Sequence, residues 1–393
     1  MDNKKILTII LVFVVYLATA GISFFAFSKV SKTSEITTPV GLPSKGATGR
    51  LEFDPNAPKT QECPLTGALY SKQQKKWWED HRPLGVMIEN HEEARPQSGL
   101  SFADVIYEAV AEGGITRFLA VYYCQDAGVI GPVRSARTYF IDFLSEYGDY
   151  PLYAHVGGAN QPGPADALSQ LADYEWTGYN DLNQFSIGFP VFWRDYDRLG
   201  HSVATEHTMY STTEKLWEYA SEEIKLGSKD KEGDAWGKRF VKYSFKEDAS
   251  VSDRGKSQSV HLEFWESMPE YFADWLYDPK TNLYKRNNGN NGGSQQLDKN
   301  NNNQLTSKNI VVLFMQESNA FDGYENNIHL LYRTKGTGRA RIFMDGKDIK
   351  GTWRKDSRTS RIKLFDETGA SVQLNKGNIW FEILPTDGVI TVK

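Results

Sequence analysis

VIYEAVAEGGITRFLAVYYC, residues 105–124, carries the clearest signal for the fold. It contains two apolar runs, 105–110 and 115–124, of the kind that form buried strands. Between them stand Ala111, Glu112, Gly113 and Gly114, and paired glycines suit a tight turn that needs positive φ. We therefore expect an antiparallel hairpin here.

Strands and helices alternate around this hairpin up to about residue 222. The run LGVMIEN (84–90) has buried-strand character, as does YPLYAHV (150–156). SARTYFIDFLSEYG (135–148) has apolar residues at helical spacing, and STTEKLWEYASEEI (211–224) opens with a capping-box pattern at Ser211 and Glu214. This alternation predicts an N-terminal α/β layered domain over residues 71–225.

The second half of the chain has a different pattern. Short apolar runs, such as NIVVLFMQ (309–316) and NIWFEIL (378–384), are separated by turn residues at close intervals. This spacing predicts a mostly antiparallel β C-terminal domain over residues 226–393. Inside it, the Asn- and Gly-rich stretch 285–309 has almost nothing to bury, and we expect it to be a long disordered loop.

The first residues form a separate segment. Ile6 to Phe27 contains no charged residue in 22 positions, enough to span a bilayer as a helix at about 1.5 Å per residue. A cleaved signal peptide is the alternative, because Ala18-Thr19-Ala20 has the form of a cleavage site; the apolar run continues past it, which favours retention. We expect residues 1–28 to be a single transmembrane anchor, residues 29–70 a flexible linker, and the main domains to lie outside the cytoplasm.

Charge and cysteine content limit the possible partners. Lys and Arg number 45 against 50 Asp and Glu, so the net charge of −5 provides no broad basic surface for nucleic acid. Outside the cytoplasm, the two cysteines, Cys63 and Cys124, either form one disulfide or remain two buried thiols. The sequence leaves both alternatives open.

The stretch IGPVRSART (130–138) suggests an anion-binding helix start. If Ser135 caps the following helix, its free N–H groups and the positive end of its dipole face the same space as Arg134 or Arg137. Between residues 95 and 137 the chain has four arginines and no lysine, which favours bidentate binding of phosphate or carboxylate. The alternative is internal pairing of these arginines with nearby carboxylates. The candidate ligand-binding residues are Arg95, Arg117, Arg134, Ser135, Arg137, Glu108, Glu112, Asn90 and His155.

Other chemistry has weaker support. His155, His201, Glu206 and His207 do not have the spacing that fixes two metal ligands on one helix, so we expect neither a metal nor a cofactor. Ser98 and Ser135 have no base placed beside them by spacing. Glu89, Glu108 and Glu112 could act as acid or base in a cleft, but such residues are more often solvated or paired. Trp176, Tyr179 and Trp193 could stack on sugars, but aromatic residues at this density more often form a core.

Several long motifs resemble one family. Residues 82–123, together with IGPVRSART, HVGGA (155–159) and EHTMYSTTEKLW (206–217), are similar to the YerB-like family of bacterial envelope lipoproteins, which have a domain of unknown function. The resemblance implies an envelope-attached protein with an N-terminal α/β domain and a C-terminal β domain. The chain differs in having a membrane helix where many relatives have a lipid-modified cysteine. It also differs at Glu206 and Thr208, where PHN rather than EHT is expected, and this departure counts against carrying any family role over to His207.

Two hypotheses about function follow. The first is a non-catalytic module that binds peptidoglycan or an anionic wall glycopolymer through its arginines. The second is an enzyme, because the architecture is also similar to that of the LytR-CpsA-Psr family of envelope phosphotransferases, which act on lipid-pyrophosphate-linked glycans. That resemblance implies that phosphate and magnesium are bound by Asp104, Arg117, Arg134 and Arg137. The SIPRD-type run expected in that family is missing from this chain. We favour the binding module, because the sequence positions no nucleophile or base.

Overall fold

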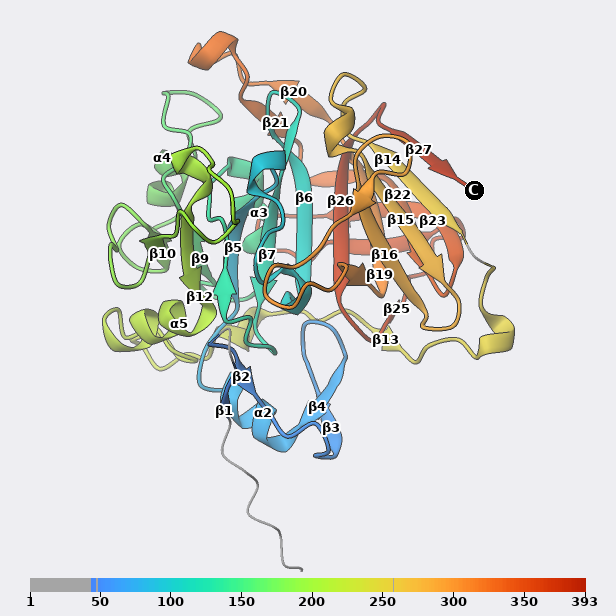
Figure 1. Ribbon diagram of the computed structural model, residues 1–393, viewed down its shortest axis with the longest axis horizontal. Helices are drawn as coiled ribbons and strands as arrows, with labels where there is room; N and C mark the ends of the chain where they lie inside the picture. Colours follow the sequence, from blue (N-terminus) through green and yellow to red (C-terminus); the bar gives the residue numbers. More distant parts are fainter. Residues whose placement is uncertain (1–43, 47–48, 257) are drawn as a thin grey trace, which may run out of the picture. The chain divides into compact units, whose positions relative to one another are not determined.

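The computed structural model describes residues 44–46, 49–256 and 258–393 (Figure 1). The transmembrane anchor expected at residues 1–28 and the first part of the expected linker lie outside these residues. Among the helices that the structure describes, none is both long and apolar enough to cross a membrane.

Ten strands form a central sheet to which both halves of the chain contribute. In their order across the sheet, they are β10 (Asp181–Asn183), β9 (Leu152–His155), β5 (Leu84–Glu89), β7 (Ile115–Tyr122), β6 (Val105–Glu112), β26 (Ile379–Pro385), β19 (Asn309–Met315), β22 (Gly336–Met344), β23 (Lys347–Lys355) and β24 (Lys363–Asp366). β10, β9 and β5 are parallel to one another, as are β6, β26 and β19, and the other neighbours are antiparallel.

The hairpin expected at residues 105–124 is confirmed. β6 and β7 pair antiparallel, and Gly113 and Gly114 form the turn with φ of 56° and 85°. Successive residues of β7 alternate between two apolar clusters: Phe118 and Ala120 face one side, and Leu119 and Val121 the other. The hairpin is therefore buried on both faces, which explains its nearly continuous apolar sequence.

A second sheet lies in the C-terminal half. Its antiparallel strands are β17 (Ser294–Gln295), β16 (Leu283–Asn288), β15 (Ala273–Asp278), β14 (Ser259–Glu263) and β27 (Val389–Val392), with β18 (Thr306–Ser307) beside β16. Figure 1 shows this sheet over the C-terminal strands of the central sheet. Val260 and Trp275 share one apolar cluster with Val312 and Trp380, so the two sheets pack face to face.

In the part of the chain that the structure describes, four short α-helices pack around the central sheet. They are α2 (Lys72–Trp78), α3 (Thr138–Leu144), α4 (Ala167–Asp173) and α5 (Thr213–Glu222). α3 and α4 pack on one face, through Phe140 and Leu171, whereas α5 packs on the other, through Leu216. The capping residue of α5 is Thr212, whose side chain accepts from the Lys215 N–H, and not the expected Ser211.

The remaining elements are short. The 3₁₀ helices are η1 (Glu92–Ala94), η2 (Leu100–Phe102), η3 (Thr205–His207), η4 (Trp236–Arg239), η5 (Val251–Asp253), η6 (Pro269–Tyr271) and η7 (Tyr324–Asn326). A small sheet contains β11 (Trp193–Arg194), β12 (Met209–Thr212) and β8 (Val129–Ile130). Four pairs complete the fold: β1 (Ser44–Lys45) with β2 (Leu51–Glu52), β3 (Lys59–Glu62) with β4 (Leu69–Ser71), β13 (Phe245–Lys246) with β25 (Leu374–Asn375), and β20 (Glu317–Asn319) with β21 (Leu330–Tyr332).

The later part of the expected linker, residues 49–70, is attached to the domain. Cys63 forms a disulfide with Cys124 at a Cα separation of 6.0 Å, and Leu65 beside it is fully buried. Arg50 donates to the Asp126 carbonyl over 2.8 Å. These contacts hold a segment whose polar composition alone indicated a flexible chain.

The expected disordered loop at residues 285–309 is also different in the structure. Parts of β16, β17 and β18 lie within it, and Arg286, Gln296 and Asp298 are buried. Asp298 accepts hydrogen bonds from the Gly99 and Ser101 N–H groups, 3.0 and 2.8 Å away. The segment is ordered because its polar side chains satisfy buried partners in the N-terminal half.

A buried ion group joins the two halves of the chain. Arg286 on β16 lies between Glu108 on β6 and Glu382 on β26, at 2.5 and 2.7 Å, and all three side chains are fully buried. Glu108 and Glu382 are register partners on neighbouring parallel strands. Burial, followed by the charge of Glu108, raises the pKa of Glu382 well above its ordinary value, which favours the protonated form of Glu382 beside the guanidinium.

Replacing the Arg286 guanidinium should destabilise the fold. Arg286→Met leaves two buried carboxyls without a cation, and we expect a loss of about 3–5 kcal/mol of unfolding free energy, measured by urea denaturation. The matched control is Arg341→Met, because Arg341 pairs with Asp348 near the surface; we expect a loss of about 1 kcal/mol or less. Equal losses in the two variants would contradict the role of Arg286.

The disulfide should also stabilise the fold. It closes a loop across a sequence separation of 61, and we expect Cys63→Ser with Cys124→Ser to lower the unfolding free energy by about 2–5 kcal/mol. Reduced wild type, measured in the same denaturant series, should show a similar loss. Unchanged stability in both would show that the remaining contacts suffice to hold residues 49–70.

Candidate functional site

The candidate site lies at one edge of the central sheet, where strands end. β5 ends at Glu89 and the parallel β9 at His155, so both residues stand at the carboxyl edge, where open α/β sheets commonly bind ligands. Arg117 is the register partner of Glu89 on β7. The 130–138 stretch crosses this edge, because the Arg134 N–H donates to the Met87 carbonyl over 2.9 Å.

Three of the four predicted arginines meet at this edge with two glutamates. Arg117 contacts Glu112 at 2.7 Å, Arg137 also pairs with Glu112, and Arg134 pairs with Glu89. We call these five residues the edge cluster. The exposed fraction of the side chain is 1% for Arg117, 7% for Arg137 and 22% for Arg134. Arg134 is therefore the arginine most open to an incoming ligand.

The charged groups of the edge cluster are largely shielded from water, and this burial shifts their pKa values. Burial lowers the pKa of Arg134 and of Arg137, opposed by the charge of Glu89 among others. Burial by itself would raise the pKa of Glu89, but the contact with His207 and the charges of Arg134 and Arg117 lower it to about 2. Within the edge cluster three guanidinium groups thus face two carboxylates, and the charge of Glu206 also acts on Arg134.

The expected helix cap at Ser135 is wrong. α3 begins at Thr138, and its N-cap is Arg137, whose side chain makes no capping bond. Ser135 instead contributes its carbonyl, which accepts from Arg117 Nη1 at 3.0 Å. The segment before α3 is pinned to the sheet by backbone hydrogen bonds, so the helix starts two residues later than the sequence suggested.

Arg95 lies apart from the other three arginines. Its guanidinium donates to the carbonyl of Asn90 at 3.0 Å and to that of Glu270 at 3.1 Å. The Asn90 amide in turn donates to Glu108 and Thr116, at 3.3 and 2.7 Å. Arg95, Asn90 and Glu108 therefore belong to the buried network around Arg286. Arg95 also lines a separate cleft of about 740 Å³ together with Asn288 and Gln296.

His155 is brought to the edge but faces inward. Its Nε2 lies 2.6 Å from Asp181 and its Nδ1 lies 2.7 Å from the Gly157 carbonyl, and the side chain is fully buried. Both ring nitrogens lie within hydrogen-bonding distance of an oxygen. This pairing orients the loop after β9 and leaves no ring nitrogen for a ligand.

The structure brings together three residues that the sequence did not group. His91 and His207 stack at 4.7 Å between ring centroids, with 16° between their planes. His207 Nδ1 lies 3.5 Å from Glu89, and its Nε2 lies 3.7 Å from Glu93. His201, which the sequence considered beside His207, is exposed. The signal for the actual set was the run ENHEE, where acidic residues flank a histidine just after β5.

The remaining candidates are structural in this fold. Asp104 is fully buried beside the disulfide and accepts from the N–H groups of Tyr123 and Cys124, at 2.7 and 2.8 Å. Its carboxylate therefore holds the backbone at the disulfide, whereas the phosphotransferase resemblance implied that it binds magnesium. Ser98 accepts from Arg198 at 2.7 Å. Trp176 is a core residue, and Trp193 is half-buried on β11.

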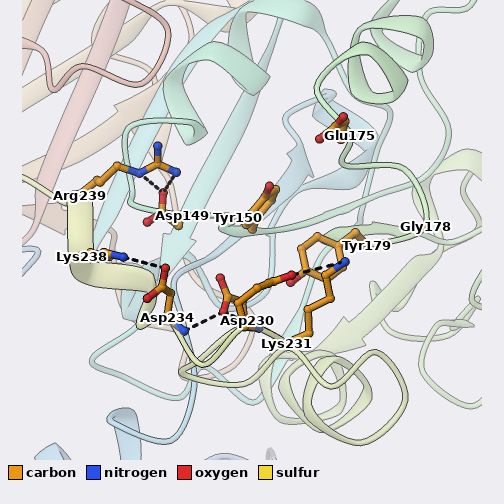
Figure 2. A pocket seen from close by; sticks show the side chains of 11 residues that line it. Asp149, Tyr150, Glu175, Gly178, Tyr179, Asp230, Lys231, Asp234, Lys238 and Arg239 are labelled. Atoms are coloured by element: carbon orange, nitrogen blue, oxygen red, sulfur yellow. Dashed lines mark hydrogen bonds and ion pairs between the residues drawn. The ribbon is translucent and has the colours of Figure 1, made fainter.

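Tyr179 lines a different cleft, of about 700 Å³ (Figure 2). Its ring meets Tyr150 edge to face, 4.9 Å away. Figure 2 shows the basic side chains of this cleft turned to its acids, Arg239 to Asp149 and Lys238 to Asp234. The charges of the cleft are therefore largely paired within it.

Comparison with known proteins defines the family. The model of the N-terminal domain of the protein of unknown function DUF3048 matches residues 65–227, and that of its C-terminal domain matches residues 260–381. The chain belongs to this family.

The chain is similar to the protein named "Putative lipoprotein YerB" from Bacillus subtilis (strain 168). It is 27% identical to it over 334 residues, which cover 84% of this chain and 88% of that protein. The crystal structure of the YerB protein from Bacillus subtilis has the same fold, with a TM-score of 0.67 at 23% identity, covering 84% of this chain and 100% of that one.

The ionisation of Glu89 can be tested by measuring the unfolding free energy as a function of pH. Its pKa is lowered from 4.5 to about 2 on folding, so its contribution to stability is present above pH 4.5 and lost as the pH falls toward 2. At neutral pH this contribution is roughly 3 kcal/mol. We expect Glu89→Gln to be less stable than wild type at pH 6 and the difference to shrink below pH 4.5, measured by urea unfolding at each pH. A difference that stays constant from pH 6 to 3 would contradict this electrostatic role.

Proposed function

We propose that this protein is held at the bacterial membrane by its N-terminal segment and binds an anionic cell-wall polymer outside the cytoplasm, through the edge cluster. The observation that carries the binding proposal is the gathering of Arg117, Arg134 and Arg137 at one sheet edge, where the Arg134 side chain is 22% exposed. Phosphate-bearing wall glycopolymer is the polymer we favour, because planar guanidinium groups bind phosphate bidentately.

The location rests on separate evidence. A disulfide between Cys63 and Cys124 is typical of an oxidising compartment outside the cytoplasm. The printed name of the relative from Bacillus subtilis is that of a lipoprotein, and this supports attachment to the envelope. In this chain we propose that the uncharged run from Ile6 to Phe27 provides that attachment as a single membrane-spanning helix.

Binding to the wall tests the proposal. Full-length protein in detergent should sediment with purified wall material and release as salt rises, because the contact is electrostatic. We expect Arg134→Gln to weaken binding about tenfold or more, since Arg134 is the most exposed arginine of the cluster. The measurement is a co-sedimentation isotherm on walls with their phosphate polymer and on walls stripped of it.

The control is Arg239→Gln, which removes a more exposed guanidinium that pairs with Asp149 elsewhere on the protein. It should bind like wild type. Equal binding to stripped walls would identify peptidoglycan as the ligand and contradict the phosphate polymer. Binding that survives Arg134→Gln unchanged would contradict the edge cluster as the site.

A further inference from the structure

We propose that His91, Glu93 and His207 bind a divalent transition-metal ion of the Zn²⁺ type. Two imidazoles and one carboxylate are donors that zinc prefers, and a set of two histidines and one glutamate is typical of zinc sites that keep one position open. This site stands independently of wall binding, because it uses residues outside the edge cluster.

The distances suit a bridging ion better than direct hydrogen bonds. The three donor atoms lie within 4.8 Å of one another, and His207 Nε2 is 3.7 Å from Glu93 Oε2. That separation is too long for a hydrogen bond. Zinc binds nitrogen and oxygen at about 2.0–2.2 Å, so two donors on a tetrahedral ion lie roughly 3.3 Å apart. The rings of His91 and His207 are stacked, so one of them must turn out of the stack before both rings direct a nitrogen to the same ion.

The fold holds the two histidines from separate elements. His91 is the N-cap of η1, directly after β5, and its Nδ1 accepts from the Glu93 N–H at 3.3 Å. Metal binding by His91 would break at most this one long hydrogen bond. His207 ends η3, more than a hundred residues later, and is buried with its ring stacked on that of His91.

Glu89 supports the site from behind. It faces His207 Nδ1 at 3.5 Å, on the opposite side of the ring from Nε2 and Glu93. Metal-binding histidines commonly donate their other ring N–H to a carboxylate, which fixes the tautomer and orients the ring. Glu89 is placed to accept from Nδ1–H if the ring moves slightly toward it, which would leave the lone pair of Nε2 for the ion, and Glu89 also pairs with Arg134 of the edge cluster.

The site is open to solvent on one side. Glu93 has a side-chain exposure of 53%, and His91 is half-buried, whereas His207 is buried. With three protein ligands, a fourth position is left for water or for an atom of a bound molecule. The other described group with suitable donors, Cys63, Asp104 and Cys124, is fully buried and its sulfurs form the disulfide.

Metal titration of the whole protein tests the inference. Untagged full-length chain, purified in detergent and stripped with a chelator, is titrated with Zn²⁺ by calorimetry in a phosphate-free buffer, and with Co²⁺ by visible absorption. We expect one ion per chain and the absorption of a tetrahedral Co²⁺ site. His91→Ala with His207→Ala should weaken binding about a hundredfold or more, because two of three ligands are removed.

Two further variants make the test specific. His201→Ala removes an exposed histidine near His207 in the sequence and should bind metal like wild type. Glu93→Gln changes an exposed side chain and so should fold normally; we expect it to bind about tenfold more weakly or worse. Wild type that binds no ion, a double variant or Glu93→Gln that binds like wild type, or an equal loss in His201→Ala would each overturn the site. Wall polymer is absent, so the result is independent of the proposed wall binding.

Discussion

Arg286 is the residue on which the arrangement of the whole protein depends. A guanidinium from the C-terminal half is fully buried between Glu108 of the N-terminal half and Glu382, and those two carboxyls lie side by side on β6 and β26. Buried charges are tolerated only when they are paired, so the two family domains cannot part without exposing or stranding this group. The result is one continuous sheet shared by both domains.

This constraint also positions the candidate site. The hairpin of β6 and β7 is fixed on one side by β26, and on the other side it holds β5 in register, so Arg117 lies opposite Glu89. Glu89 then serves two groups of residues, because it pairs with Arg134 and faces His207. A single carboxylate thus joins the arginines that we propose bind an anion to the histidines that we propose bind a metal.

The sequence predicted what depends on local pattern and missed what depends on distant partners. Two nearly continuous apolar runs and the paired glycines between them specify the hairpin. Three of the four arginines singled out in the sequence do lie together. Arg95 lies apart from them, because the chain bends after β5 and brings its guanidinium to the Asn90 carbonyl. Composition does not reveal this bend. The Asn- and Gly-rich run at 285–309 was predicted to be disordered because its composition offers little to bury. The partner that buries Arg286, Glu108, lies 178 residues away in the sequence. His91 and His207 come together only through tertiary structure.

The most direct measurement is a crystal structure of the protein grown with Zn²⁺ and inorganic phosphate, with anomalous diffraction recorded at the zinc edge. The account predicts an anomalous peak among the side chains of His91, Glu93 and His207, and a phosphate within hydrogen-bonding distance of Arg134. Zinc bound elsewhere would contradict the metal site, and an Arg134 guanidinium with no phosphate beside it would contradict the anion site.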